Sequence, residues 1–223
     1  MPTHRRIKEE AGPARQTAMG YFPFFVDLEG RPGLVVGGGT VALRKVQKLL
    51  PYGPCLTVVS PHILPELERI SGLTLARREF SPEDLDGMFF VVAATDDRDL
   101  NRKISTLCQE RNIPVNAVDD REACSFLFPA LVKQGDLSVG ISTGGASPTA
   151  AIWLKEQVAG LLPDRFDEIL SWLEEQRPLL KDTLPQESQR SRLFTRLFAA
   201  CMDRGGPLAE GEAREILQEE GLE

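Results

Sequence analysis

A cluster of glycines near the start of the chain has the spacing of a nucleotide-binding turn. Residues 37–42 (GGGTVA) match the pattern G-x-G-x-x-G/A and directly follow the apolar run 34–36. In this pattern the first glycine makes a tight turn, the second lets the backbone approach a pyrophosphate, and a small sixth residue lets the helix pack against the sheet. The N–H groups at the helix start then face the phosphates. The alternative is a tight strand-to-helix turn with no ligand. The predicted nucleotide contacts are Gly37, Gly38, Gly39, Thr40 and Val41.

The acidic residue that usually binds the ribose is missing from this sequence. It is expected about 20 residues after the glycines, but the second apolar run, 56–60, ends in Ser60-Pro61-His62. Ser60 could hydrogen-bond a ribose hydroxyl, and Pro61 and His62 could lie beside the adenosine. His62 is equally compatible with an ordinary surface histidine. NAD is the preferred cofactor, although without an acid nothing here repels the 2′-phosphate of NADP.

A later apolar run, 89–94, ends in Thr95-Asp96-Asp97. Open α/β sheets bind ligands at the carboxyl ends of their strands, so Thr95 is expected to contact the cofactor. Asp97 could do the same, but the simpler interpretation is that it caps the helix that follows.

Strands and helices alternate up to residue 120, which predicts a parallel, doubly wound sheet. After residue 120 the pattern changes to a hairpin, with strands 126–132 and 137–142 joined by a turn at 133–136, and then to helices. The fold class is therefore α/β, with a Rossmann-type sheet followed by a small β segment and a helical domain. The predicted strands of the sheet are 34–36, 56–60, 73–76, 89–94 and 114–118. The predicted helices are one that follows the glycine turn and ends before Pro51, 64–70, one starting at Ser81, 97–112, 149–162, 164–176, 187–203 and 207–219.

Composition and charge exclude several classes of protein. The 223 residues have a net charge of −7, which argues against non-specific nucleic-acid binding. Four cysteines lack C-x-x-C spacing and only two histidines are present, so we expect reduced thiols in a cytoplasmic protein and no metal site. Residues 1–19 are polar and are predicted to form a flexible tail, not a signal peptide. No run is long and apolar enough to span a membrane.

Five motifs, in this order, resemble one known family. They are residues 37–45 (GGGTVALRK), 93–97 (AATDD), 115–119 (VNAVD), Ser125-Phe126 with Pro129, and 142–148 (STGGASP). Together they resemble the precorrin-2 dehydrogenase / sirohydrochlorin ferrochelatase family of sirohaem synthesis over roughly residues 21–200. The resemblance implies oxidation of precorrin-2, a tetrapyrrole, to sirohydrochlorin with NAD⁺ as hydride acceptor. Some members also insert Fe²⁺.

The resemblance also implies a division of the chain and an oligomeric state. Members are homodimers with intertwined central regions and an active site at the domain junction. For this chain the implied parts are an NAD-binding Rossmann domain at 20–120, a dimerisation segment at 121–148 and a helical domain at 149–223.

Several site residues follow from the resemblance. The family's key acid corresponds to Asp119, which would be catalytic; a carboxylate at a strand end could take a proton as hydride leaves, or it could only shape the turn. The implied substrate contacts are Asn116, Thr143, Gly144 and Ser147. The substrate has eight carboxylates and needs cations. The candidates are Arg44, Lys45, Arg121, Lys133, Arg190, Arg192 and Arg196, most of them expected on the solvated surface.

Other functions remain open from the sequence. Because only His4 and His62 could assist in metal delivery, we expect weak or absent ferrochelatase activity. A non-catalytic NAD-sensing regulatory module would use the same glycine turn, although it would need neither Asp119 nor the motif at 142–148. A dehydrogenase of another small acid is disfavoured because no histidine is placed as a catalytic base.

Overall fold

The structure is a computed structural model that describes residues 20–219. The chain forms two compact units, the first ending at Leu127 and the second beginning at Phe128. Each unit has its own hydrophobic core. No helix among the described residues is long and apolar enough to cross a membrane.

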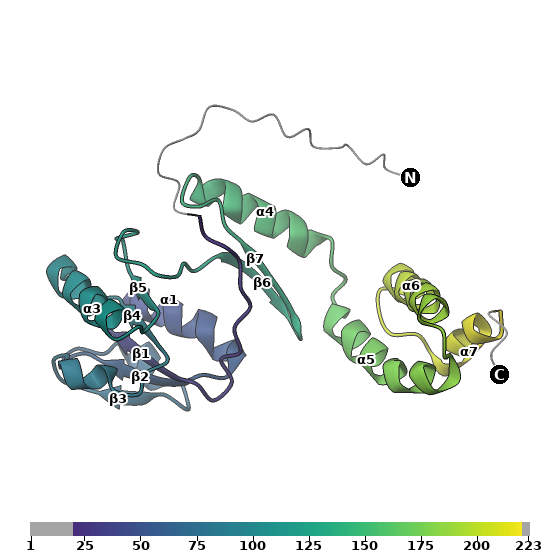
Figure 1. Ribbon diagram of the computed structural model, residues 1–223, viewed down its shortest axis with the longest axis horizontal. Helices are drawn as coiled ribbons and strands as arrows, with labels where there is room; N and C mark the ends of the chain where they lie inside the picture. The colour runs from purple at the N-terminus through teal and green to yellow at the C-terminus, as the bar shows by residue number, and fades with distance from the viewer. Residues whose placement is uncertain (1–19, 220–223) are drawn as a thin grey trace. The chain divides into compact units, whose positions relative to one another are not determined.

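The first unit is built around a five-stranded parallel sheet with the order β3-β2-β1-β4-β5 (Figure 1). This confirms the doubly wound sheet predicted from the alternating pattern. The strands are β1 (Pro32–Val36), β2 (Cys55–Val59), β3 (Thr74–Ala76), β4 (Phe90–Ala93) and β5 (Val115–Ala117). The connecting helices are α1 (Thr40–Leu49), η1 (Leu50–Tyr52), α2 (Pro65–Glu68), η2 (Pro82–Leu85) and α3 (Arg98–Glu110).

The order of the strands places α1 and α3 on opposite faces of the sheet. The chain moves from β1 to β2 in one direction and from β4 to β5 in the other, and crossovers between parallel strands are right-handed. Alternate residues of each strand then face different helices. Val36, Ala93 and Ala117 belong to the core cluster that also holds Ile104 and Cys108 of α3.

The other face of the sheet carries a row of residues in register. Val35 pairs with Val58 on one side and with Val92 on the other, and Val92 pairs with Asn116. All four are buried. This row lies beneath α1, and Asn116 is its polar member.

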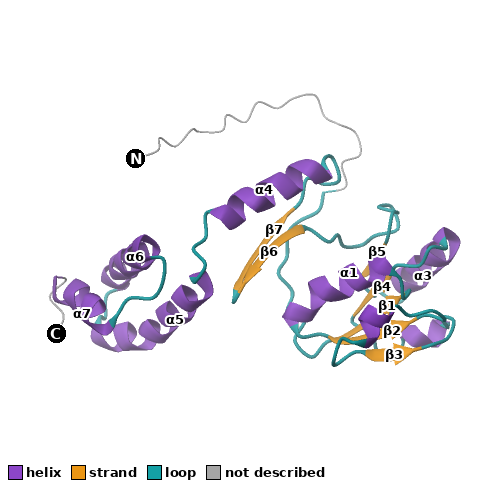
Figure 2. Ribbon diagram, turned by 180° about the vertical axis from the view of Figure 1, so that it is seen from behind, coloured by secondary structure: helices purple, strands orange, loops and turns teal. Residues whose placement is uncertain are grey.

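Within residues 128–219, the second unit contains a hairpin and four helices (Figure 2). Strands β6 (Ala130–Gln134) and β7 (Leu137–Ile141) are antiparallel and are joined at Gly135-Asp136, with Gly135 at φ 52°. This confirms the predicted hairpin. The first strand was predicted to begin at 126 but begins at 130, because Phe126 instead bonds back to β5 through its N–H. The helices are α4 (Pro148–Gly160), α5 (Phe166–Thr183), α6 (Glu187–Arg204) and α7 (Glu210–Glu219).

Helix α5 differs from its prediction. It was expected to end at 176, two residues before a proline, but it continues through Pro178 to Thr183. A proline inside a helix removes one backbone hydrogen bond. Here the helical turn after it is retained because Leu180 and Leu184 are buried against Leu193 and Leu197 of α6 in the core of the unit.

Candidate active site

The three glycines of the turn after β1 have different structural roles. Gly37 has φ +119°, and a Cβ there would lie 2.3 Å from the carbonyl oxygen of Ala94. A Cβ on Gly38 would lie 2.1 Å from the carbonyl oxygen of His62. The protein's own packing therefore requires glycine at both positions. The nucleotide-binding pattern gives Gly38 no role, so this requirement was missed by the sequence analysis.

Gly39 is not required by packing. Its φ of −88° and ψ of −170° suit any residue, and nothing lies within 4 Å of the position that a Cβ would take. It is the N-cap of α1, and no side chain caps this helix. Open space beside an uncapped helix start, with its unpaired N–H groups and partial positive charge, fits a pyrophosphate. The residues present therefore fit a dinucleotide at the predicted place.

The predicted adenosine-side residues lie beside the glycines. The Ser60 hydroxyl donates to the carbonyl of His62 (2.8 Å), which closes the turn after β2. The Leu64 N–H donates to the carbonyl of Gly38 (3.0 Å), so residues 60–64 are fixed against the glycine turn. Pro61 and His62 are exposed. The structure thus brings Ser60, Pro61 and His62 together with Gly38.

Thr95 lies next to Gly37, since a Cβ on Gly37 would be 3.1 Å from its nitrogen. Its hydroxyl donates to the side-chain oxygen of Asn101 (2.7 Å), and the Asn101 amide donates back to the Thr95 carbonyl (3.0 Å). Asn101 is 2% exposed. It therefore holds the turn between β4 and α3, a role that the sequence analysis missed. The sequence signal for this role was the position of Asn101, a polar residue, on the same helix face as the apolar Ile104 and Cys108.

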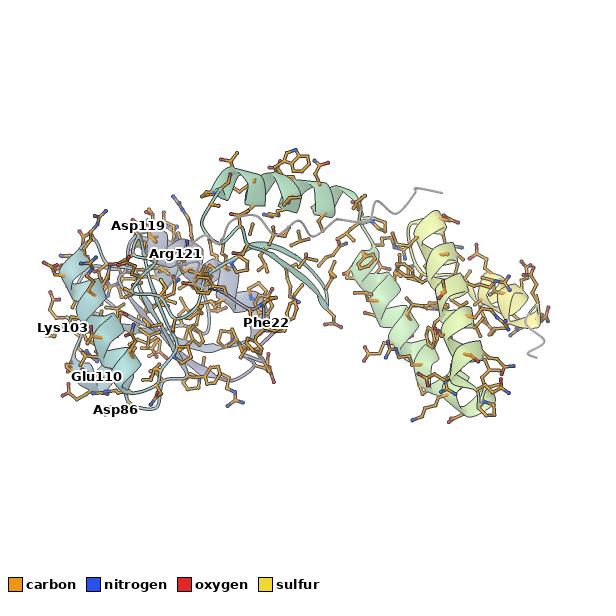
Figure 3. The ribbon with its side chains drawn as sticks, turned by 45° about the horizontal axis from the view of Figure 1, so that its top comes forward. Phe22, Asp86, Lys103, Glu110, Asp119 and Arg121 are labelled. Carbon is orange, nitrogen blue, oxygen red and sulfur yellow. The ribbon has the colours of Figure 1, made fainter. Side chains whose placement is uncertain are left out.

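The two aspartates after β5 differ in their partners. Asp120 pairs with Arg102 (2.5 Å) and accepts from the Ala123 N–H (3.3 Å). The Arg102 guanidinium holds the pKa of the Asp120 carboxyl below its usual value. Asp119 is exposed and makes no hydrogen bond or ion pair with any of residues 20–219. Figure 3 shows Asp119 and Arg121 at one end of the unit and Asp86 and Glu110 at the other.

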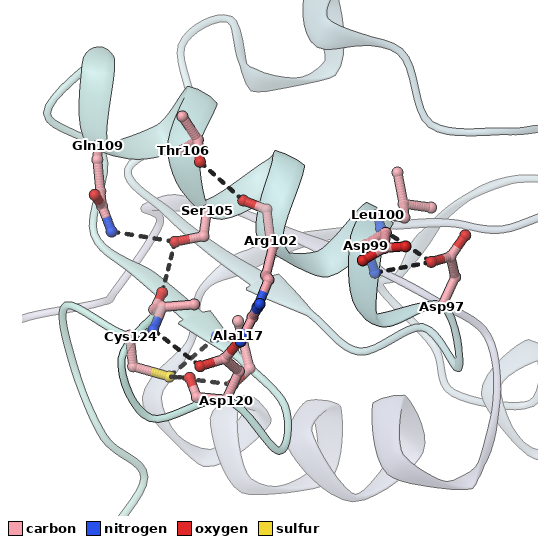
Figure 4. Close-up of polar contacts among 11 residues, drawn as sticks. Asp97, Asp99, Leu100, Arg102, Ser105, Thr106, Gln109, Ala117, Asp120 and Cys124 are labelled. Carbon is pink, nitrogen blue, oxygen red and sulfur yellow. Dashed lines mark hydrogen bonds and ion pairs between the residues drawn. The ribbon is translucent and has the colours of Figure 1, made fainter.

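The loop that carries Asp119 is fastened to β5 (Figure 4). The Cys124 sulfur accepts from the Ala117 N–H (3.2 Å), and the Ser105 hydroxyl of α3 donates to the Ala123 carbonyl (2.6 Å). Burial raises the pKa of the Cys124 thiol. Asp119 itself has φ 60°, a conformation that aspartate tolerates better than most residues. The hydrogen bonds of Cys124 and Ala123 hold the loop and thereby set the position of Asp119.

Asn116 and Lys45 meet on the α1 face of the sheet. The Lys45 ammonium donates to the Asn116 side-chain oxygen (3.3 Å), and the Asn116 amide donates to the Phe126 carbonyl (3.0 Å). Burial lowers the pKa of Lys45 to about 8; Lys48 lowers it further, while Cys124 and Asp119 act in the opposite direction. Asn116 is 5% exposed, so its amide serves internal contacts.

The other candidate cations are mostly held at the surface. The Arg121 guanidinium lies over the ring of Tyr21, 5.5 Å from its centre. Arg190 donates to the carbonyls of Leu184 and Pro185, and Arg196 pairs with Glu219. Lys133 donates to the Gly135 carbonyl within its own hairpin.

The motif at 142–148 forms a self-contained loop in the second unit. The Ser147 side chain caps α4 by accepting from the Ala150 N–H (3.2 Å). The Thr143 hydroxyl accepts from the Ser147 N–H (3.1 Å) and donates to the Ser147 carbonyl (3.0 Å). Gly144 has φ 60°. The two hydroxyls therefore shape the loop.

Comparisons with known proteins agree with this geometry. Residues 24–130 match the family model described as putative NAD(P)-binding, and residues 134–161 match the one described as sirohaem biosynthesis protein central. The siroheme synthase of Thioalkalivibrio sulfidiphilus is 40% identical over 86% of this chain, and that of Zymomonas mobilis 35% over 92%. The chain spans 39% and 44% of the lengths of these relatives.

One protein of solved structure is similar to this chain over nearly its whole length. SirC, a precorrin-2 dehydrogenase, is 29% identical, with a TM-score of 0.72, over 90% of this chain and 99% of its own. Fold and glycine turn thus define an NAD(P)-binding protein of the Rossmann class. Within that class, the resemblance to the precorrin-2 dehydrogenase and siroheme synthase family is confirmed.

Proposed function

We propose that this chain oxidises precorrin-2 to sirohydrochlorin with NAD⁺. The observation that carries the proposal is the combination of an open, uncapped helix start at Gly39 with an exposed carboxylate at Asp119 that makes no hydrogen bond or ion pair within residues 20–219. Both follow strands of the same parallel sheet. The substrate comes from the names of the relatives, which include siroheme synthases and a precorrin-2 dehydrogenase.

The residues of the first unit divide into those that hold the cofactor and one that accepts a proton. NAD⁺, when bound, supplies the hydride acceptor. The N–H groups at the start of α1 hold the pyrophosphate, Ser60, Pro61 and His62 border the adenosine, and the backbone around Thr95 borders the cofactor beyond Gly37. Dehydrogenation also releases a proton, and the exposed Asp119 carboxylate is the group placed to accept it.

The loop at 142–148 is the proposed contact for a substrate carboxylate. Gly144 offers backbone without a side chain, and the hydrogen bonds of Thr143 and Ser147 hold that backbone in place. Asn116 is buried, and its amide donates to the Phe126 carbonyl. It therefore contributes to the site by holding neighbouring residues in place.

A homodimer formed through the central segment is part of the proposal. Helix α4 leaves large apolar side chains exposed, with Trp153 57% exposed and Ile152 53%. Such a patch is typical of an interface. Light scattering should report a dimer of the full chain, and Trp153→Glu should convert it to monomer; a wild-type monomer at micromolar concentration would contradict the dimer.

The free cysteines support placing the protein in the cytoplasm.

Fe²⁺ insertion is expected to be weak or absent, because His62 is the one histidine among residues 20–219 and lies beside the glycine turn; His4 lies outside the described residues. Conversion of sirohydrochlorin to sirohaem much faster than the uncatalysed Fe²⁺ background would contradict this expectation.

The test of the oxidation is an anaerobic assay of precorrin-2 and NAD⁺, with NADH and sirohydrochlorin followed by absorbance. Asp119→Asn keeps the side-chain shape and should lower kcat by about 100-fold or more, the usual contribution of a positioned base. Asp120→Asn is the matched control and should stay within a few-fold of wild type, because Asp120 serves the loop through Arg102 and Ala123. No NADH from a wild type that binds NAD⁺ would refute the proposed reaction and favour an NAD-sensing module.

A further inference from the structure

Lys45 brings a cationic side chain from α1 to the end of β5, where the loop that carries Asp119 begins. It lies on α1, above the row of valines that ends in Asn116, and its ammonium is 3.3 Å from the Asn116 oxygen. The side chain is half-buried, which is costly for a charge unless a partner stabilises it. A lysine that served only to keep the surface soluble would not need to lie so close to the sheet.

The Asn116 amide has a fixed orientation. Its nitrogen lies 3.0 Å from the Phe126 carbonyl, and a carbonyl can only accept a hydrogen bond. The NH₂ group must therefore face Phe126, and the oxygen must face Lys45. The asparagine thus presents an acceptor to the lysine and anchors the ammonium where α1 meets the end of β5.

Burial is the main cause of the lowered pKa of Lys45, and three titratable neighbours also act on it. Lys48, one turn further along α1, repels it, and Cys124 and Asp119 from the loop after β5 attract it. Because burial raises the pKa of the Cys124 thiol, that thiol is neutral near pH 7. Of the two groups that attract Lys45, Asp119 is therefore the one that carries a negative charge under these conditions.

We infer that Lys45, anchored by Asn116, is a positioning residue that supplies a fixed positive charge beside Asp119. This inference rests on the proposed function, in which a carboxylate base works next to a substrate with eight carboxylates. Like charges repel at short range, so a nearby cation that offsets the repulsion helps a carboxylate base to work beside a polyanionic substrate. Lys45 acts through Asp119 and is not assigned a contact with the substrate.

The role of Lys45 makes activity sensitive to alkaline pH. Since its pKa is lowered to about 8, the ammonium is charged below that pH and neutral above it. The wild type should therefore lose kcat as the pH rises through about 8. Lys45→Arg keeps its charge throughout this range and should move that decline to higher pH.

The kinetic test compares wild type, Lys45→Met, Lys45→Arg and Lys48→Met in the full chain. Lys45→Met should lower kcat at pH 7 by roughly tenfold, which corresponds to part of the interaction energy of two unit charges near a protein surface. The kcat of this variant should not decline further near pH 8. Lys45→Arg should restore most of the rate. Lys48→Met is the matched control, an exposed lysine of the same helix, and should stay within about twofold.

Two kinetic outcomes would overturn the inference. A rise in KM with kcat and its pH profile unchanged would make Lys45 a substrate-binding residue. An equal loss at every pH in both Lys45→Met and Lys45→Arg would make its role structural.

A second test needs no catalysis. In full-length protein with ¹³C-labelled lysine, the Lys45 Cε signal should titrate with a midpoint of about 8. Asp119→Asn removes the attracting charge and should lower that midpoint by about half a pH unit. An unchanged midpoint would refute the coupling of Lys45 to Asp119 even in an active enzyme. The expected shift in a chain that does not oxidise precorrin-2 would leave the coupling intact and refute the proposed reaction instead.

Discussion

Two helices of the first unit begin at the same edge of the sheet but in different ways. Helix α3 follows β4, and the Asp97 carboxylate caps it by accepting from the N–H groups of Asp99 (2.9 Å) and Leu100 (3.0 Å). Helix α1 follows β1, the neighbouring strand, and begins at Gly39 with no capping side chain. A helix start has unpaired N–H groups that require partners. The cap of α3 lies within the protein, whereas the open space at Gly39 leaves the start of α1 available to the phosphates of a nucleotide.

The largest loss of stability is expected from Gly37→Ala. The side chain would force φ +119° on an L-residue and place Cβ 2.3 Å from the Ala94 carbonyl. Backbone must move to relieve this contact, so the free energy of unfolding should fall by about 3 kcal/mol or more. Urea denaturation measures it. A fall below about 1 kcal/mol would mean that the turn can relax, and would remove the distinction between Gly37 and Gly39.

Asn101→Ala should have the next largest effect. The asparagine is buried and exchanges hydrogen bonds with the Thr95 hydroxyl and backbone. Its removal leaves these groups unsatisfied at a cost of about 1–3 kcal/mol and should weaken NAD⁺ binding a few-fold, since Thr95 adjoins Gly37. Thr106→Ala, an exposed site on the same helix, serves as the control. Unaltered NAD⁺ affinity in Asn101→Ala would separate the β4–α3 turn from the cofactor site.

Asp97→Ala tests the capped helix start. Loss of the cap should lower the free energy of unfolding by about 1 kcal/mol and leave NAD⁺ affinity within about twofold. Asp97→Asn preserves an acceptor and should remain close to wild type in thermal unfolding. A large loss of NAD⁺ affinity in Asp97→Ala would show that the cofactor uses both helix starts.

Gly39→Ala should change stability least. Its backbone conformation suits alanine and the Cβ meets nothing, so stability should be unchanged or higher by about 0.4–1 kcal/mol through a less flexible unfolded chain. The same methyl should lower NAD⁺ affinity about tenfold or more if it occupies space needed by the pyrophosphate. Lower stability with normal NAD⁺ affinity would reverse the assignments of Gly37 and Gly39.

The sequence predicted those features that depend on nearby residues. The apolar runs and the glycine turn predicted the parallel sheet, and Asp97 was interpreted correctly as a helix cap. The contact between Lys45 and Asn116 could not be predicted, because it depends on strand register and on the packing of α1 across the sheet. The continuation of α5 beyond Pro178 was missed for a similar reason, since burial of Leu180 outweighs the local effect of the proline.

The most direct measurement is a calorimetric titration of NAD⁺ into wild type and Gly39→Asp, with thermal unfolding of both. The substitution gives α1 the kind of cap that α3 has and places a negative charge where the phosphates are expected. We predict an affinity at least about 100-fold lower, from repulsion and loss of the N–H groups, with a Tm equal to or above that of wild type. Unchanged NAD⁺ affinity in a folded Gly39→Asp protein would contradict the assignment of the α1 start as the cofactor site.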